Sequence, residues 1–464
     1  MSARGRARRE YCRCRRRVSV DLRVDGLAAD HDPVRRRSGG VDSHPAARQG
    51  RAGIGEVTLG GRFHRLFGAT LVSSVGTGMH ATALPLLALQ STSGPIALSL
   101  VVVAAELPWV LASLHAGVVV DRLDRRRVMV WADLGRFAVL VALVALILTS
   151  RVDLLVLVFA AFLLGLGQVF FDVAAQSAIP DFVSRDPGSL ATANGRITAA
   201  ESVGEDFAGP PVGSALFGVG NFLPFAGNAL SFAASGLLIL SIRTDAEPEE
   251  KSDVPRESVW TDIVEGVRWL VGNRTLRALA VVSCLGNVVV TAQFAMLVLL
   301  AKEVLGLPDS GFGLLLTATA VGATAGGLAA AAAAKRFGPG AVLLTGKAGV
   351  GAAVLVLGLA ADAWVAAAMM MVTGALMTAE KVVVSTLRQR IVPRGLLGRV
   401  LSSSRLVVMA GGPVGAALGG VLAGAFTVQV PYVAGGVLLI LVALAFYPVL
   451  NNRALARATD EPVG

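Results

Sequence analysis

The sequence contains little charge, few aromatic residues and almost no cysteine. Of its 464 residues, only 16% are charged and 6% are aromatic. The three cysteines, Cys12, Cys14 and Cys284, match neither a disulfide framework nor the spacing of a metal site. The sequence also lacks a Gly-x-x-x-x-Gly-Lys-Ser/Thr phosphate loop, a nucleophile with a matching base, and a His-rich motif. We therefore expect no ATPase or other enzyme, no metal and no cofactor.

Long apolar runs are what the sequence has in abundance. Hydrophobic residues make up 54% of the chain, and uncharged windows recur from Leu66 to Leu450. A bilayer core of about 30 Å requires roughly 20 apolar residues per helix. The windows therefore predict an all-α membrane protein with twelve transmembrane helices. These are expected near residues 65–90, 96–120, 128–150, 154–171, 196–219, 222–242, 276–301, 311–334, 341–361, 363–384, 400–425 and 428–450.

The net charge of +10 is concentrated at the beginning of the chain. Residues 1–55 contain 14 arginines and 6 acidic residues, which give +8 of the total. Because this tail has no periodic apolar residues, we interpret residues 1–60 as a disordered basic segment. A translation start at Val57, which would remove most of it, stays open as an alternative. The arginines of such a tail suit anionic lipid at the bilayer surface, and we expect no nucleic-acid partner.

The remaining basic residues lie almost entirely in alternate loops. If the first helix runs outward, the loops that face the cytoplasm carry Arg122, Arg125, Arg126, Arg127, Arg243, Lys251, Arg256, Arg268, Arg274, Lys335, Arg336, Arg388, Arg390, Arg394, Arg399, Arg453 and Arg457. The opposite loops offer little beyond Arg151 and Lys302. Cytoplasmic loops of membrane proteins carry an excess of Lys and Arg. We therefore predict a multi-pass protein of the cell (inner) membrane, monomeric, with both termini in the cytoplasm.

The longest polar connection divides the predicted helices into six and six. Residues 244–275 begin with a charged run and continue with apolar residues at helical spacing, which predicts a helix on the membrane surface; a plain spacer is the alternative. The predicted parts are a tail (1–60), a first half (61–243), this linker (244–275), a second half (276–450) and a cytoplasmic tail (451–464).

An internal repeat supports the division into halves. The fifth predicted helix contains GPPVGSALFG at 209–218, and the eleventh contains GGPVGAALGG at 411–420. Both segments hold the same place in their half, as a parallel duplication of six helices requires. Glycines let helices approach closely and proline permits a bend. We therefore expect Gly209, Pro210 and Gly213, and Gly412, Pro413 and Gly415, to form bends and close contacts where the halves meet.

The loop after the second predicted helix reads GVVVDRLDRRRVM. Gly117 predicts close approach of two helices, Asp121 predicts hydrogen bonds to a neighbouring helix N-terminus, and the arginines predict pairing with acidic helix ends such as Asp172. Contacts of this kind form and break when two halves rock. We therefore interpret Gly117, Asp121, Arg122, Arg125 and Arg126 as a conformational latch, against the alternative of a plain basic loop.

This loop resembles the cytoplasmic signature of the major facilitator superfamily, with Asp124 where glycine usually stands. The resemblance extends over residues 60–450 and is closest to the drug/proton antiporter branch with macrolide-efflux proteins and the enterobactin exporter. The segment at Gly209, Pro210 and Gly213 also resembles the antiporter signature of drug exporters. The resemblance implies the major facilitator fold and alternating access, with export as the direction of transport. The matching loop of the second half keeps Lys335 and Arg336 but has no Asp.

Ionisable residues within apolar helices are costly and therefore mark candidate coupling sites. Glu201 and Glu205 are four residues apart on one helix face, so their charges repel, and Asp206 adds a third carboxylate. This cluster is the first candidate for proton coupling, with solvation at a helix end as the alternative. A pair formed by His80 and Glu106, at similar depth on neighbouring helices, is the second candidate. A polar residue beside a water-filled cavity mouth is its alternative.

Further charged residues fall into two groups. Asp133 and Arg136 lie one turn apart and are expected to neutralise each other, whereas Asp362 and Glu380 are expected at helix ends beside water. The related branch usually has an acidic residue between two glycines of the first helix. Here Thr77 stands between Gly76 and Gly78, so coupling has to use other residues.

Taken together, these features predict a secondary active transporter that exports a small amphipathic molecule, such as a drug, an antibiotic or a siderophore-like compound, in exchange for protons. Two alternatives stay open. One is proton-coupled uptake of a small nutrient, and the other is a membrane sensor or assembly protein that transports nothing. The predicted partners are a small-molecule substrate, protons and the lipid bilayer.

Overall fold

The computed structural model describes residues 60–91, 94–183, 187–242, 259–393 and 396–460. The predicted basic tail lies outside these residues except for Gly60, as does most of the charged part of the linker. Within the unit Val57–Gly464, the described residues form helices joined by short turns, and no strand occurs among them. The predicted all-α class is therefore confirmed.

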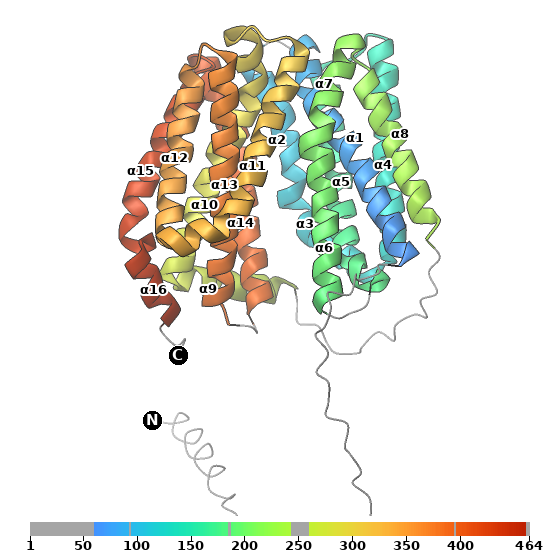
Figure 1. Cartoon of the computed structure of the whole chain (residues 1–464). Helices are drawn as coiled ribbons and strands as arrows, with labels where there is room; N and C mark the ends of the chain where they lie inside the picture. Colours follow the sequence, from blue (N-terminus) through green and yellow to red (C-terminus); the bar gives the residue numbers. More distant parts are fainter. Residues whose placement is uncertain (1–59, 92–93, 184–186, 243–258, 394–395, 461–464) are drawn as a thin grey trace, which may run out of the picture. The chain divides into compact units, whose positions relative to one another are not determined.

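The first half contains six helical rods, of which two are interrupted; Figure 1 shows how they are arranged. They are α1 (Gly61–Ser91), α2 (Pro95–Leu111) with α3 (Ser113–Arg122), α4 (Arg125–Leu148), α5 (Leu154–Phe182), α6 (Pro187–Glu201) with η1 (Ser202–Ala208) and α7 (Gly209–Val219), and α8 (Leu223–Leu240). The axes of α2 and the end of α3 differ by 55°. Pro108 lies just before this bend, where its missing amide hydrogen weakens the helix.

The second half repeats this pattern with fewer interruptions. Its rods are α10 (Arg274–Leu299) with η2 (Leu300–Val304), α11 (Asp309–Phe337), α12 (Pro339–Leu359), α13 (Ala363–Ile391), α14 (Leu397–Ala425) and α15 (Val430–Leu450). Among the described residues, 10 rods are long and apolar enough to span a membrane, and α2 with α3 makes 11. The continuous helical run of α6, η1 and α7 is consistent with the predicted twelve.

Several helices are longer than predicted, among them α5 and α13. α5 extends to Phe182 and α13 to Ile391, whereas the sequence predicted ends at 171 and 384. The predicted end of α5 stood at the first charged residue, Asp172. In the structure Gln168, one turn earlier, donates a hydrogen bond to Asp172 Oδ1 at 2.9 Å, so the carboxylate is accommodated within the helix.

The two halves are packed according to the predicted repeat. In the first half α7 lies against α1, where a Cβ on Gly209 would stand 2.5 Å from Gly78 Cα. In the second half α14 lies against α10, where a Cβ on Gly411 would stand 2.8 Å from the Cys284 carbonyl oxygen. The aligned glycines thus permit the same close helix contact twice, which supports a duplicated six-helix unit.

Two pairs of antiparallel helices join the halves. α14 packs against α2, and α11 packs against α7 and η1. Close contacts between the halves lie at Gly420 with Ser99 and at Gly313 with Pro210 and Ser214, near the beginnings of α2 and α11. We call this the distal end, and the opposite end, which carries Arg122–Arg127, α9 and α16, the basic end (Figure 1).

Two amphipathic helices at the basic end pack on the second half. α9 (Val259–Gly272) lies against α14, with Gly266 at the Arg399 carbonyl oxygen and an ion pair between Glu265 and Arg399. α16 (Asn452–Asp460) begins with Asn452, whose Oδ1 accepts from the Gly340 amide at 2.7 Å and whose Nδ2 donates to the Phe337 carbonyl oxygen at 2.8 Å. Asn452 therefore clamps the turn between α11 and α12.

Candidate functional site

The centre of the candidate site is a π-helical turn in the fifth rod. Pro210 and Pro211 have no amide hydrogen, so the carbonyls of Asp206 and Phe207 lose their regular donors four residues ahead. The helix widens over Ser202–Ala208, and the Gly209 amide donates to the Gly204 carbonyl oxygen five residues back. Turns of this type are frequent at functional sites. The equivalent rod of the second half, α14, remains an uninterrupted α-helix.

The π-helical turn carries two of the three predicted carboxylates, and Glu201 directly precedes it. Glu201 and Glu205 interact with each other electrostatically, as predicted, and both interact with Asp172 of α5. Asp172 is therefore a member of the cluster, although the sequence suggested only that it pairs with loop arginines. Several carboxylates that share one partly buried site resist joint ionisation. We call Asp172, Glu201 and Glu205 the acidic cluster.

A buried ion pair lies behind the acidic cluster. Arg136 Nη2 donates to Asp133 Oδ1, and both side chains are 1% exposed, which confirms that they neutralise each other. The Arg136 guanidinium also donates to Gln168 Oε1 and lies over the rings of Phe171 and Phe232, at 4.6 and 4.0 Å from their centroids. One carboxylate, one amide and two aromatic rings thus contact the guanidinium. Such contacts offset the free energy that is lost when a charge is buried.

Gln168 connects the buried ion pair to the acidic cluster. Its Oε1 accepts from Arg136, and its Nε2 donates to Asp172 Oδ1 at 2.9 Å. Arg136 also interacts electrostatically with Asp172 and Glu205. A change in the charge of the acidic cluster therefore alters the electrostatic environment of Arg136, both through the Gln168 side chain and directly through space.

Two cations of the second half face these acids. Lys381 of α13 interacts electrostatically with Asp206, and Arg405 of α14 interacts with Asp172. The Arg405 guanidinium also lies 5.7 Å from the ring centroid of Trp109 on α2. Both cations are exposed. Asp206 thus interacts with the second half, whereas Glu201 and Glu205 both interact with Asp172.

The structure does not support a pair formed by His80 and Glu106. His80 is partly buried and lies within electrostatic reach of Arg136. Glu106 instead lies between the halves, where a Cβ on Gly412 would stand 3.0 Å from its Oε2 and 3.6 Å from Asn287 Nδ2. The prediction was wrong because equal depth on neighbouring helices does not fix the direction of the side chains.

The predicted latch loop connects helices of the first half. Arg125 Nη1 forms an ion pair with Asp181 Oδ2 of α5 at 2.6 Å, and Arg126 donates to the Ile239 and Leu240 carbonyl oxygens at the end of α8. Asp124, which stands where the related signature has glycine, accepts from the Arg126 amide and caps α4. The departure from the signature therefore has a local structural role.

Two expectations for this loop need correction. No atom outside the helix's own backbone lies within 4 Å of the position of a Cβ on Gly117, so this glycine does not permit a close helix approach here. The acidic helix end that pairs with the arginines is Asp181, not Asp172. Asp172 lies about two and a half helical turns earlier on α5 and belongs to the acidic cluster. Asp121 and Arg122 lie exposed at the end of α3.

The glycines of the repeated segment also act differently from the expectation. Gly209 and Gly213 pack on Gly78 and Met79 of α1, within the first half. The residue aligned with Pro210 is Gly412, and these two positions face the other half.

Pro210 and Gly412 each contact a helix of the other half, whereas Gly415 packs within its own half. The Pro210 carbonyl oxygen meets Gly313 of α11, and Gly412 meets Glu106 of α2. Gly415 packs on Val288 of α10, and Pro413 lies inside the continuous helix α14. In each repeated segment, one helix face therefore packs on a helix of its own half, and the adjacent face contacts the other half. Only the adjacent face lies where the halves meet.

A second buried ion pair was missed by the sequence reasoning. Lys347 Nζ of α12 lies 2.8 Å from Glu380 Oε1 of α13, and the side chains are 6% and 7% exposed. Glu380 was expected at a helix end beside water, which is wrong, whereas Asp362 does cap α13. The signal was available, because Lys347 is a charge inside an apolar run and requires a partner. Among the described residues, no three His, Cys, Asp or Glu side chains converge as metal ligands.

Solved structures confirm the fold. The bacterial homologue of the human lysosomal transporter Spinster, in its inward-facing and occupied conformation, is 16% identical with a TM-score of 0.67 and covers 86% of this chain and 98% of its own. A bacterial homologue of the iron transporter ferroportin in an inward-facing state is 17% identical with a TM-score of 0.67, and the match covers 83% of this chain and 98% of its own. At this identity the likeness concerns the fold alone.

Curated relatives are efflux pumps. The multidrug efflux pump Tap of Mycolicibacterium fortuitum is 29% identical over 401 residues, which cover 84% of this chain and 96% of the pump. Tap of Mycobacterium bovis strain BCG is 30% identical over 220 residues, 46% of this chain and 52% of the pump. The family described as transmembrane secretion effector matches residues 60–460. This chain therefore belongs to the transmembrane secretion effectors of the major facilitator superfamily and is a multi-pass membrane transporter.

Proposed function

We propose that this protein exports small amphipathic molecules from the cell in exchange for protons, by alternating access of its two halves. The observation that carries the proposal is the similarity along nearly the whole length of a multidrug efflux pump. The tight contacts between the halves at the distal end support a conformation that opens at the basic end. With the basic end in the cytoplasm, this conformation receives substrate from inside the cell.

The acidic cluster supports proton coupling. Glu205 has three carboxylates within electrostatic reach and one buried arginine. Ionising all of them in a partly buried site is costly, so one member holds a proton until a change of environment releases it. From the other half, Arg405 interacts with Asp172 of the cluster, and Lys381 interacts with the neighbouring Asp206. Rocking of the halves alters these distances and thereby couples proton release to the conformational cycle.

The basic loop supports the role of a conformational latch. Arg125 and Arg126 hold the beginning of α4 against the ends of α5 and α8. α4 also carries Arg136, which interacts with the acidic cluster. Arg125, Arg126 and Arg136 therefore lie on one helix, and a shift of this helix affects both the loop contacts and the arginine that interacts with the acidic cluster.

Transport direction tests the proposal. The purified chain is reconstituted in liposomes with ethidium, an amphipathic fluorescent cation, as the test substrate. An imposed pH gradient should drive ethidium against its concentration, with protons moving the opposite way, and collapse of the gradient should abolish accumulation. Uncharged and anionic dyes are tested in the same way, so that substrates of every charge are examined. Movement of solute with protons would support the uptake alternative, and no flux of any tested solute would support the non-transporting alternative.

Membrane orientation is a separate prediction. Both termini, α9 and the loop at Arg122–Arg127 are expected in the cytoplasm because basic residues concentrate there. In a background without Cys12, Cys14 and Cys284, an impermeant thiol reagent applied to intact cells should label Arg151→Cys but not Arg457→Cys. Inverted vesicles should give the reverse pattern, and labelling of Arg457→Cys in intact cells would overturn the orientation.

A further inference from the structure

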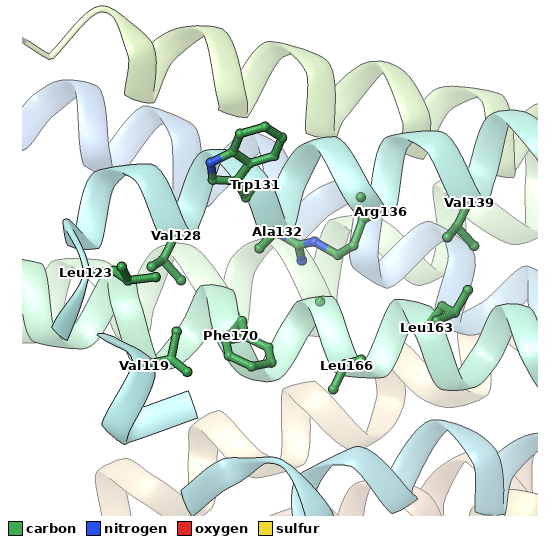
Figure 2. A pocket seen from close by; sticks show the side chains of 12 residues that line it. Val119, Leu123, Val128, Trp131, Ala132, Arg136, Val139, Leu163, Leu166 and Phe170 are labelled. Atoms are coloured by element: carbon green, nitrogen blue, oxygen red, sulfur yellow. The ribbon is translucent and has the colours of Figure 1, made fainter. Parts of the chain in front are cut away.

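An apolar groove runs along the outer side of the first half, away from the acidic cluster. Its volume is about 550 Å³, and α3, α4 and α5 supply its walls (Figure 2). From Val128 to Val139 it follows α4 for about 16 Å. The helices that pack closely on α4 are α3, α5 and α8, all of the same half. The groove therefore opens toward the surrounding bilayer and not toward the other half.

Two glycines shape the groove. Gly135 lies on the α4 wall, and no atom of a neighbouring helix lies within 4 Å of where its Cβ would stand. Gly167 lies on the α5 wall, where a Cβ would stand 2.6 Å from Arg136 Cγ. The groove thus reaches the aliphatic stem of Arg136, whose guanidinium points into the buried network. Only apolar material can fill such a channel inside a bilayer without loss of hydrogen bonds.

The basic end of the groove carries charge and an aromatic ring. Arg127 precedes Trp131 by one helical turn, so the two share a face of α4, and Arg122 precedes Leu123 of the α3 wall. The Arg127 side chain is 81% exposed, and Trp131 is 70% exposed. Tryptophan typically lies at the level of lipid headgroups, and arginine pairs with phosphate. The arginines, the tryptophan and the apolar lining thus follow one another along the groove in the same order as the phosphate, the glycerol region and the acyl chain of a phospholipid.

We infer that this groove binds one anionic phospholipid. The phosphate lies at Arg122 and Arg127, the glycerol region lies beside Trp131, and one acyl chain occupies the groove as far as Val139. The bound chain covers the stem of Arg136 from the bilayer side. The lipid thereby contacts the same helix that carries the latch arginines and the buried ion pair.

Quenching of Trp131 fluorescence by brominated lipid tests this site. A variant that retains Trp131 and has Phe at the four other tryptophan positions is reconstituted in phosphatidylcholine vesicles that contain brominated phosphatidylglycerol or, at equal mole fraction, brominated phosphatidylcholine. Phosphatidylglycerol should quench Trp131 more strongly. The double variant Arg122→Gln and Arg127→Gln should remove the excess, and Gly135→Leu, whose side chain enters open space in the groove, should reduce quenching by either lipid.

Two controls separate a site from general attraction to the basic surface. Trp364 is 84% exposed at the beginning of α13, at the distal end, so a variant that retains only Trp364 should be quenched equally by both lipids. The double variant Arg453→Gln and Arg457→Gln removes the same charge from α16 and should leave the excess at Trp131 unchanged. If the variant with one tryptophan does not fold, Trp131→Phe in the otherwise natural chain should abolish the phosphatidylglycerol-specific quenching. Equal quenching of Trp131 by both lipids would overturn the inference.

Discussion

Glu205→Gln is expected to abolish accumulation of substrate driven by a pH gradient while substrate exchange without a gradient continues. Glutamine imitates the protonated carboxyl group permanently, so the site can no longer release its proton during the cycle. The remaining carboxylates, Asp172 and Glu201, then ionise with less repulsion. In proteoliposomes, gradient-driven uptake should fall to the level of vesicles without a gradient, and counterflow of labelled substrate should stay near that of the natural chain.

Matched variants decide which carboxylates take part. Glu201→Gln and Asp172→Asn should weaken coupling in the same way, because both acids interact with Glu205. Asp206→Asn tests the carboxylate that faces Lys381. Glu106→Gln and His80→Asn are expected to retain gradient-driven transport, since neither belongs to the acidic cluster. If Glu201, Glu205, Asp206 and Asp172 variants all retain gradient-driven accumulation, the proposed coupling site is wrong.

Lys347→Met is expected to destabilise the second half severely. It leaves the Glu380 carboxylate buried without its cation, and breaking a buried pair in this way costs about 3–5 kcal/mol. Glu380→Leu should have a comparable effect, with Lys347 left uncompensated. The double variant Lys347→Met and Glu380→Leu should recover much of the lost stability, because well-packed apolar residues often replace a buried ion pair at little cost in free energy. Thermal unfolding in detergent, followed by size-exclusion chromatography, measures each step.

The pair formed by Lys302 and Asp309 is the matched control. It also joins neighbouring helices of the second half, but its side chains are 25% and 29% exposed. Partly exposed pairs contribute about 0–1 kcal/mol, so Lys302→Met should shift the unfolding midpoint little. If the double variant of Lys347 and Glu380 is as unstable as either single variant, lost packing and not an unpaired charge is the cause.

The fold could be predicted in most respects, because apolar windows and turn residues report directly on membrane helices. The end of α5 could not, since Asp172 marks a polar position that is satisfied inside the bundle and not at its surface. Glu380 was placed at a helix end beside water for the same reason, although it pairs with Lys347 inside the bundle. The same cause explains the missed residues of the site. Partners such as Gln168 and Arg405 belong to other helices, and sequence spacing reports only neighbours on the same helix.

The pairing of His80 with Glu106 failed for a related reason. Depth along a helix follows from counting residues, but the direction of a side chain depends on how each helix is rotated about its axis. The repeated segment illustrates the difference. Its sequence showed that Gly209 and Gly411 correspond, yet only the structure shows that one face packs on α1 or α10 and the adjacent face meets the other half.

The clamp formed by Asn452 makes the two halves unequal in their response to solution conditions. At the basic end of the first half, the equivalent turn is fastened by arginines, including the ion pair of Arg125 with Asp181. In the second half a neutral amide fastens it. Dissolved ions screen exposed charges but leave an amide hydrogen bond almost unaffected. Ionic strength therefore acts more strongly on this turn of the first half than on its counterpart in the second half, which the terminal helix fastens through hydrogen bonds that resist salt.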